Sequence, residues 1–170
     1  MKIIVDVMGG DNCPEAAVRG VCMAAEQWHA TYIMVGDRRQ IERVAQENGL
    51  DIRRIDIVHT ESFMTMEDDP LSVVRSKSDS SMAVGLRLLA EGKGDAFVSS
   101  GNTGALFTGA TLIVRKVKGV LRAGIGTVLP FQTPVLLLDT GANVTVTPEN
   151  LEQFGVMGAA YMRKMFDIPS

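Results

Sequence analysis

The sequence predicts an α/β layer fold with a mixed, mostly parallel sheet, and three features of the chain lead to this prediction. Short apolar runs typical of buried strands alternate with segments that carry apolar residues at helical spacing. Turns that contain glycine stand where several of these strands end. Only five residues join the apolar runs 124–129 and 135–138, which is too short for a parallel crossover, so this pair is expected to be antiparallel.

The first half of the chain is expected to hold three strands separated by helices. Residues 2–7 read KIIVDV, a nearly continuous apolar run with Asp6 near its end, which is typical of a parallel strand buried on both faces. Asp37 and Gln40 have the spacing of a capping box and predict where a helix begins. The elements expected here are strands at 2–7, 32–35 and 55–58, and helices at about 14–28 and 37–49.

A polar, acidic loop at 60–69 follows the third strand. It is interpreted either as a plain connector or as a segment that covers a site, since loops that carry function lie on the surface. Pro70 suits the first turn of a short helix, which is expected to carry Arg75 and Lys77. Both cations fit a solvated helix face as well as a binding site.

The later elements are predicted from caps and periodicity. Ser78 or Asp79 is expected to cap a helix that ends before Gly92, and Thr147 precedes the start of the last helix. The other elements expected here are strands at 96–98, 124–129 and 135–138 and a last helix from 148 to about 166, whose apolar stripe is Leu151, Phe154, Gly158, Tyr161, Met162 and Met165.

Residues 95–117 are the stretch in which chemistry is most strongly indicated. The apolar run 96–98 changes into a helix through the turn 99–104, which reads SSGNTG. A strand that leads into a helix N-terminus leaves backbone N–H groups unpaired, with the positive end of the helix dipole behind them, and such a place binds anions. Alternatively, Ser100 or Asn102 merely caps the helix and the glycines shape an ordinary turn. This motif alone does not separate the two interpretations.

Composition narrows the classes of partner and location. The 170 residues, 46% hydrophobic and 22% charged, can bury a core and predict one domain, or one lobe of a larger protein. A net charge of −3 with interspersed signs argues against a nucleic-acid partner. No apolar stretch reaches the roughly 18 residues that span a bilayer, and no signal peptide is recognised, so a cytoplasmic location is expected. The spacing of the cysteines and histidines predicts no metal site.

Three turns, at 8–12, 99–104 and 139–143, each follow a predicted strand and combine glycine with Asp, Asn, Ser or Thr. In an open α/β sheet, ligands bind outside the carboxyl ends of the strands. If the three strands are parallel neighbours, these turns meet in one crevice rich in N–H donors, which suits a phosphate-bearing ligand. A nucleophile from the protein is not indicated, because there is no G-x-S-x-G motif and neither histidine accompanies a serine or cysteine.

Five motifs follow one another along the whole chain. They are MGGDN at 8–12, P-x-x-x-x-R-x-K-x-D-S-S-M at 70–82, SSGNTGAL at 99–106, LLLDTGAN at 136–143 and QFGVMG at 153–158. Together and in this order they resemble one known family, the phosphate acyltransferases of bacterial phospholipid synthesis. The chain departs from the family at Thr145 and Val146, where an aspartate and a cysteine are usual, and at Cys13, where a small residue is usual.

The resemblance implies a three-layer α/β/α fold similar to phosphotransacetylases and to the isopropylmalate dehydrogenase group, usually as a homodimer. It implies transfer of a fatty acyl group from acyl carrier protein to inorganic phosphate, with no metal or organic cofactor. Peripheral association with a membrane is compatible with this role. It also implies that the chain corresponds to the N-terminal half of a longer family chain.

The resemblance and the three turns together predict the site residues. Phosphate is expected to bind Ser100, Gly101, Asn102, Thr103, Gly104, Arg75 and Lys77. Catalysis and orientation are expected from Asn102, Asp11 and Asn12. Further cleft residues are expected at Asp6, Gly9, Gly10, Asp139, Gly141 and Asn143.

Two other functions stay open on the sequence alone. A phosphotransacetylase-like enzyme would use the same phosphate chemistry with a coenzyme A thioester in place of the acylated carrier protein. A phosphate-binding or dimerising α/β module would share the fold without catalysis.

Overall fold

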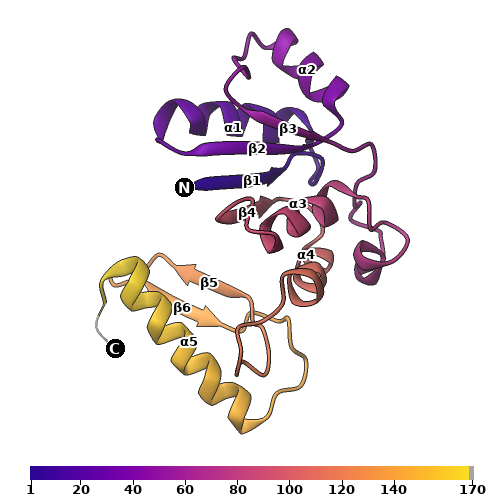
Figure 1. The fold of residues 1–170 in the computed structure, drawn as a ribbon. Coiled ribbons are helices and arrows are strands. Elements are labelled where there is room, and N and C mark those ends of the chain that lie inside the picture. Colours follow the sequence, from indigo (N-terminus) through magenta and orange to yellow (C-terminus); the bar gives the residue numbers. More distant parts are fainter. Residues whose placement is uncertain (169–170) are drawn as a thin grey trace. The chain divides into compact units, whose positions relative to one another are not determined.

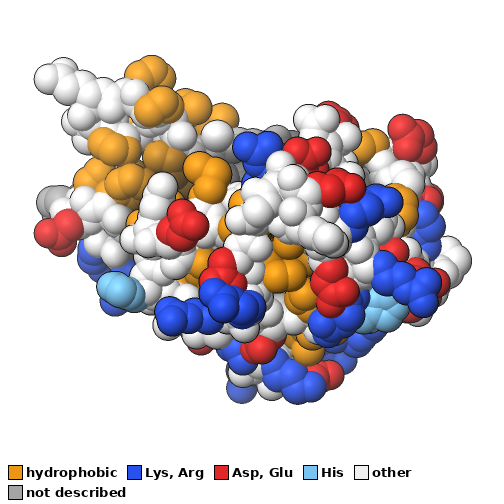
Figure 2. Space-filling model, turned by 90° about the horizontal axis from the view of Figure 1, so that it is seen from above, with side chains coloured by type: hydrophobic (Ala, Val, Ile, Leu, Met, Phe, Trp, Pro, Cys, Tyr) orange, Lys and Arg blue, Asp and Glu red, His pale blue; other side chains and the backbone are white. Residues whose placement is uncertain are grey.

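In the computed structural model, which describes residues 1–168, the chain forms two compact units, Met1–Arg115 and Lys116–Ser170 (Figure 1). The expectation of one domain or lobe over residues 1–170 stays a prediction. Within the described residues no helix is long and apolar enough to cross a membrane. On the face seen in Figure 2, acidic and basic side chains alternate and do not gather into an area of one sign.

The first unit is built on a parallel sheet with the strand order β3-β2-β1-β4. Its strands are β1 (Lys2–Asp6), β2 (Thr31–Gly36), β3 (Asp56–His59) and β4 (Ala96–Ser99). The register places Asp6 opposite both Val35 and Ser99, so β1 and β4 end at the same edge of the sheet. This edge is the one at which a ligand is expected in a parallel α/β sheet.

Alternate residues of the strands face two different helix layers, as the two-residue period of a strand requires. Val5 and Met34 pack with α1 (Glu15–Gln27) and α2 (Arg38–Glu47), while Ile4 and Ile33 pack with α3 (Ser81–Ala90) on the other face (Figure 1). Helix α4 (Thr103–Gly109) runs directly into a π-helix, Ala110–Val114. The predicted three-layer α/β/α fold is therefore confirmed.

Local sequence patterns predicted the cap of one helix correctly and that of another wrongly. Asp37 caps α2, with its carboxylate accepting hydrogen bonds from the backbone N–H of Arg39 and from the side chain of Gln40. The prediction that Ser78 or Asp79 caps α3 is wrong, because the cap is Ser80, whose hydroxyl accepts from the backbone N–H of Ala83. Residues 77–80 instead form a turn, closed by a hydrogen bond from the Ser80 N–H, which delays the helix start.

The short helix after Pro70 is a single 3-10 segment, Pro70–Val74. It ends before the two cations that it was expected to carry. Arg75 is its C-terminal cap and Lys77 lies in the following turn.

The second unit consists of the hairpin β5 (Gly126–Leu129) and β6 (Val135–Leu138) with helix α5 (Pro148–Phe166) on one face. The antiparallel pairing is confirmed. Among the described residues these two strands bond only to each other, so the chain holds one parallel and one antiparallel sheet in place of the single mixed sheet expected. Phe154 of the predicted α5 stripe is 4% exposed. Tyr161 and Met165, from the same stripe, are exposed.

Candidate functional site

The turns after β1 and β4 touch each other backbone to backbone. A Cβ atom built on Gly9 would lie only 2.9 Å from the Cα of Gly101 and 2.9 Å from its nitrogen. Real side chains do not approach that closely, so the absence of a side chain at Gly9 is what lets the two turns meet. Two of the three turns predicted to converge therefore do so, at the carboxyl edge of the parallel sheet.

A buried carboxylate holds this junction together. Asp6 is 2% exposed, and its two oxygens accept hydrogen bonds from the backbone N–H of Met8 (3.1 Å) and from the hydroxyl of Ser99 (2.8 Å). The same Ser99 oxygen accepts from the N–H of Gly101 at 3.1 Å. The Gly101 N–H, which was expected to face an anion, is therefore bonded within the turn. Ser99 was not predicted as a site residue, because only the strand register places it opposite Asp6.

Ser100 locks the two turns from the other side. Its hydroxyl donates to the carbonyl of Gly9 at 2.9 Å, which uses the hydroxyl proton. Gly10 has φ +102°, a conformation that favours glycine, and a Cβ there would lie 2.8 Å from the Ser100 Oγ. Both glycines of this turn are therefore required by close approach to the β4 turn.

Asn102 is the N-terminal cap of α4 and also fastens the acidic loop. It is 7% exposed, and its Oδ1 accepts from the N–H of Ala105 at 3.0 Å. Its Nδ2 donates to the carbonyls of Thr65 and Asp68, each at 3.1 Å, with a longer contact of 3.4 Å to Met66. An amide nitrogen carries two hydrogens. The side chain therefore has no donor left for a ligand, and the capping interpretation of Asn102 holds for its side chain.

Free donors remain at the next two positions of the turn. Helix α4 starts at Thr103, so the N–H groups of Thr103 and Gly104 have no acceptor within the helix. Both residues are exposed. The Thr103 hydroxyl makes no hydrogen bond to the described part of the chain. These groups form the part of the predicted anion site that is accessible.

The two predicted cations, Arg75 and Lys77, differ in whether their charge is already paired within the protein. Lys77 pairs with the carboxylate of Asp68 at 2.5 Å and donates to the carbonyl of Phe63 at 3.0 Å. The Lys77 hydrogen bond is the main cause that lowers the pKa of Asp68. Arg75 is exposed, and within residues 1–168 its guanidinium makes no hydrogen bond or ion pair. Arg75 is therefore the cation of this segment that is free to meet an anion.

Asp11 and Asn12 lie in the turn between β1 and α1. Both are exposed, and their side chains make no hydrogen bond to the described residues, although the Asn12 carbonyl accepts from the N–H of Ala16. The sequence expectation that they orient a ligand stays a prediction.

The third turn, at 139–143, belongs to the second unit. The condition for its convergence fails, because β6 pairs antiparallel with β5 and is not a parallel neighbour of β1 or β4. Asp139 accepts from the N–H of Ile125 at 2.8 Å and from the N–H and side chain of Asn143 at 2.7 and 2.9 Å. Burial raises the pKa of Asp139, but these hydrogen bonds outweigh it and lower the pKa overall. With Gly141 at φ +111°, the turn is held by hydrogen bonds within itself and to residues 123–125 of the same unit.

The described residues also bear on metal binding. Across positions 1–168, no three His, Cys, Asp or Glu side chains gather in a way that could hold a metal ion.

The match to known proteins extends over the whole chain. Residues 1–170 match the family model described as fatty acid synthesis protein. The chain belongs to this family.

Two curated relatives are similar to this chain over nearly its whole length. A phosphate acyltransferase of Acetivibrio thermocellus is 44% identical over 170 residues, which are 99% of this chain and 50% of the relative. A phosphate acyltransferase of Thermotoga neapolitana is 46% identical over 164 residues, which are 96% of this chain and 47% of the relative. The chain spans about half the length of the curated relatives that it matches.

Solved structures resemble this chain in fold. A phosphotransacetylase from Streptococcus pyogenes has a TM-score of 0.75 at 20% identity and covers 99% of this chain, with 55% of that structure matched. The EutD phosphotransacetylase from Staphylococcus aureus has a TM-score of 0.70 at 21% identity, with 95% of this chain and 52% of that structure matched. The expected likeness to the phosphotransacetylase fold is confirmed.

Proposed function

We propose that this chain carries the phosphate-binding part of an acyltransferase that moves a fatty acyl group from acyl carrier protein to inorganic phosphate. The relatives named phosphate acyltransferase, which match the chain over 99% and 96% of its length, support the reaction class. The observation that carries the proposal is the pair of unpaired N–H groups of Thr103 and Gly104, which the start of α4 leaves without an acceptor within the helix. Their turn follows β4 at the carboxyl edge of the sheet, the edge at which α/β sheets bind ligands.

In this proposal the residues divide into ligands and supports. Thr103 and Gly104 donate backbone hydrogen bonds to phosphate, and Arg75 supplies positive charge. Asn102 acts through the turn that it holds, since its amide is already used by Ala105 and the loop carbonyls. Ser100 and Gly101 fix the turn through their bonds to Gly9 and Ser99.

The reaction needs positioning more than activation of phosphate, which is anionic at neutral pH. A phosphate oxygen forms a bond to the thioester carbonyl carbon, the C–S bond breaks, and the sulfur leaves as a thiolate that water protonates. The product is an acyl phosphate. Holding the phosphate and the thioester in line accelerates the reaction, because the reacting atoms are already oriented. A donor aimed at the developing oxyanion contributes about 3 kcal/mol where it is well placed.

Phosphate titration by calorimetry tests the site with two matched pairs of variants. Thr103→Pro removes one N–H at the first helical position, where proline is favoured, and Asn102 already has the extended ψ of 109° that a following proline needs. Thr103→Ala keeps this N–H and removes only the hydroxyl. Arg75→Gln removes the free cation, and Arg43→Gln removes an exposed arginine on α2.

The expected result is weaker phosphate binding for Thr103→Pro and Arg75→Gln, with parent-like binding for Arg43→Gln. Thr103→Ala is expected to fall between parent and proline variant. Equal binding by all four variants would remove the phosphate site from this turn.

Turnover separates the proposed function from its alternatives. Thiol release would be measured with phosphate and either acylated carrier protein or acyl-coenzyme A. Release from the carrier protein supports the proposal, and release from coenzyme A alone would assign a phosphotransacetylase-like activity. Phosphate binding without release from either would assign a binding module.

A further inference from the structure

Asp6 is a buried acidic residue to which the proposed reaction assigns no role. It stands at the end of β1 and is 2% exposed, and among residues 1–168 no lysine, arginine or histidine forms an ion pair with it. Burying a carboxylate without a cation is costly unless hydrogen bonds satisfy its oxygens. A carboxylate is therefore not what the packing of the strand alone would favour at this position.

A chain of hydrogen bonds with a fixed direction starts at this carboxylate. A carboxylate only accepts, so the single hydroxyl hydrogen of Ser99 is used by the Oδ2 of Asp6, at 2.8 Å. The lone pairs of the Ser99 oxygen are then left for a donor, and the N–H of Gly101 donates to them at 3.1 Å. The carboxylate thereby keeps the Gly101 N–H bonded within its own turn.

The same carboxylate also contacts the turn that follows β1. Its Oδ1 accepts from the N–H of Met8 at 3.1 Å, and a Cβ built on Gly9 would lie only 2.9 Å from its Oδ2. Ser99, which bonds to this Oδ2, is the residue at which β4 ends. One side chain therefore holds both of the turns that meet at the carboxyl edge of the sheet.

We infer that Asp6 and Ser99 are positioning residues for the phosphate turn after β4. They hold its backbone so that the free N–H groups of Thr103 and Gly104 are oriented toward the anion. The inference rests on the proposed function. Neither side chain has a donor left for phosphate, because Asp6 has none and the Ser99 hydrogen is already used. Both therefore act through the backbone, by way of Gly101, and not by touching the substrate.

Two substitutions at one position test the inference. Ser99→Ala removes the hydroxyl and both of its hydrogen bonds, whereas Ser99→Thr keeps the hydroxyl and suits a strand. The extra methyl group has room, because Ser99 borders an open hollow of about 350 Å³ between α1 and β4. Threonine should therefore rescue what alanine loses. Circular dichroism and urea unfolding check that both variants are folded.

The first measurement is made on the whole chain without phosphate. Residual dipolar couplings report the direction of each backbone N–H bond. The couplings of Thr103 and Gly104 should change in Ser99→Ala and return to parent values in Ser99→Thr. The Gly101 amide should exchange with solvent about fivefold faster in the alanine variant, as expected for one lost hydrogen bond. Parent-like couplings of Thr103 and Gly104 in this variant would overturn the inference.

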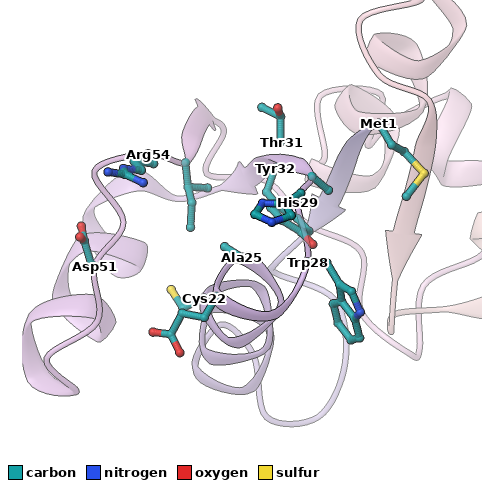
Figure 3. Close-up of a pocket in the computed structure, with 12 residues that line it drawn as sticks. Met1, Cys22, Ala25, Trp28, His29, Thr31, Tyr32, Asp51 and Arg54 are labelled. Atoms are coloured by element: carbon teal, nitrogen blue, oxygen red, sulfur yellow. The ribbon is translucent and has the colours of Figure 1, made fainter.

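The second measurement is phosphate calorimetry on the same samples. Ser99→Ala should bind phosphate about fivefold more weakly than the parent, and Ser99→Thr should bind as the parent does. Arg54→Gln is the control for an exposed arginine outside the site. Arg54 borders a hollow of about 660 Å³ that Met1 and Thr31 also line, at the amino ends of β1 and β2 (Figure 3). This control should bind phosphate as the parent does.

The outcomes separate the inference from the proposed function. Phosphate binding by Ser99→Ala that equals or exceeds that of the parent would overturn the inference and leave the proposed function. Equally weak binding by the alanine and threonine variants would also overturn it. If the parent binds no phosphate, the proposed function fails, and the couplings of Thr103 and Gly104 still decide whether the pair positions the turn. Weaker binding by Arg54→Gln, with parent-like binding by Ser99→Ala, would place the phosphate at the opposite edge of the sheet and overturn both.

Discussion

Replacing Asn102 with alanine should destabilise the first unit by about 3 kcal/mol. The helix cap to Ala105, made at 3.0 Å, contributes about 1 kcal/mol. The two donor bonds of 3.1 Å, to the carbonyls of Thr65 and Asp68, contribute about 1 kcal/mol each, because their acceptors lose a partner in a part-buried place. The 3.4 Å contact to Met66 is too long to add to this sum.

The two functions of Asn102 can be separated by a second substitution. Asn102→Asp keeps an acceptor for the Ala105 N–H and adds a negative charge at the helix N-terminus, which is favourable. It cannot donate, so the carbonyls of Thr65 and Asp68 would face a carboxylate oxygen. The helix start should survive in this variant while the acidic loop loosens.

Urea unfolding and limited proteolysis measure the two effects. We expect Asn102→Ala to lower the free energy of unfolding by about 3 kcal/mol, as the sum of one cap and two hydrogen bonds. Both variants should be cut faster within residues 60–69 than the parent. A loss below about 1 kcal/mol for the alanine variant, or parent-like cutting of the aspartate variant, would refute the account of Asn102 as a clamp on the loop.

Three further predictions concern other contacts. Gly9→Ala should lower the free energy of unfolding by about 1–3 kcal/mol, because the added Cβ meets the backbone of Gly101. Gly20→Ala adds its Cβ in open space and should raise the free energy of unfolding by up to about 1 kcal/mol. Urea unfolding curves that shift in the same direction for both variants would contradict this. Phe154→Ala should cost about 3 kcal/mol in the same assay, and a cost below about 0.5 kcal/mol would place the ring in solvent. The pKa of Asp68 is lowered on folding, so its pair with Lys77 stabilises the folded state above the unfolded pKa of about 3.9, and this stabilisation is lost as the pH falls. The difference in free energy of unfolding between the parent and Lys77→Met should therefore shrink from pH 6 to pH 3. A constant difference would exclude the ion pair as its cause.

Much of the fold could be predicted from the sequence, because strands and helices are encoded by local spacing. The buried run at 2–7 and the apolar stripes of α2 and α5 repeat with the period of the element they form. The glycine turns after β1 and β4 were also visible, since glycine marks positions where backbone must bend or approach closely. The family could also be recognised from the sequence, because its motifs are short and contiguous.

The candidate site was only partly predictable, because its contacts join residues distant in the chain. Ser99 meets Asp6 across 93 positions, and Asn102 holds carbonyls 34 to 37 positions away. No local pattern distinguishes Lys77, whose charge Asp68 neutralises, from Arg75, whose charge is free. The sequence by itself determined which residue types stand at the turns. Only the tertiary structure decided which of them hydrogen-bond to one another, because strand register and loop packing determine the partners of each polar group.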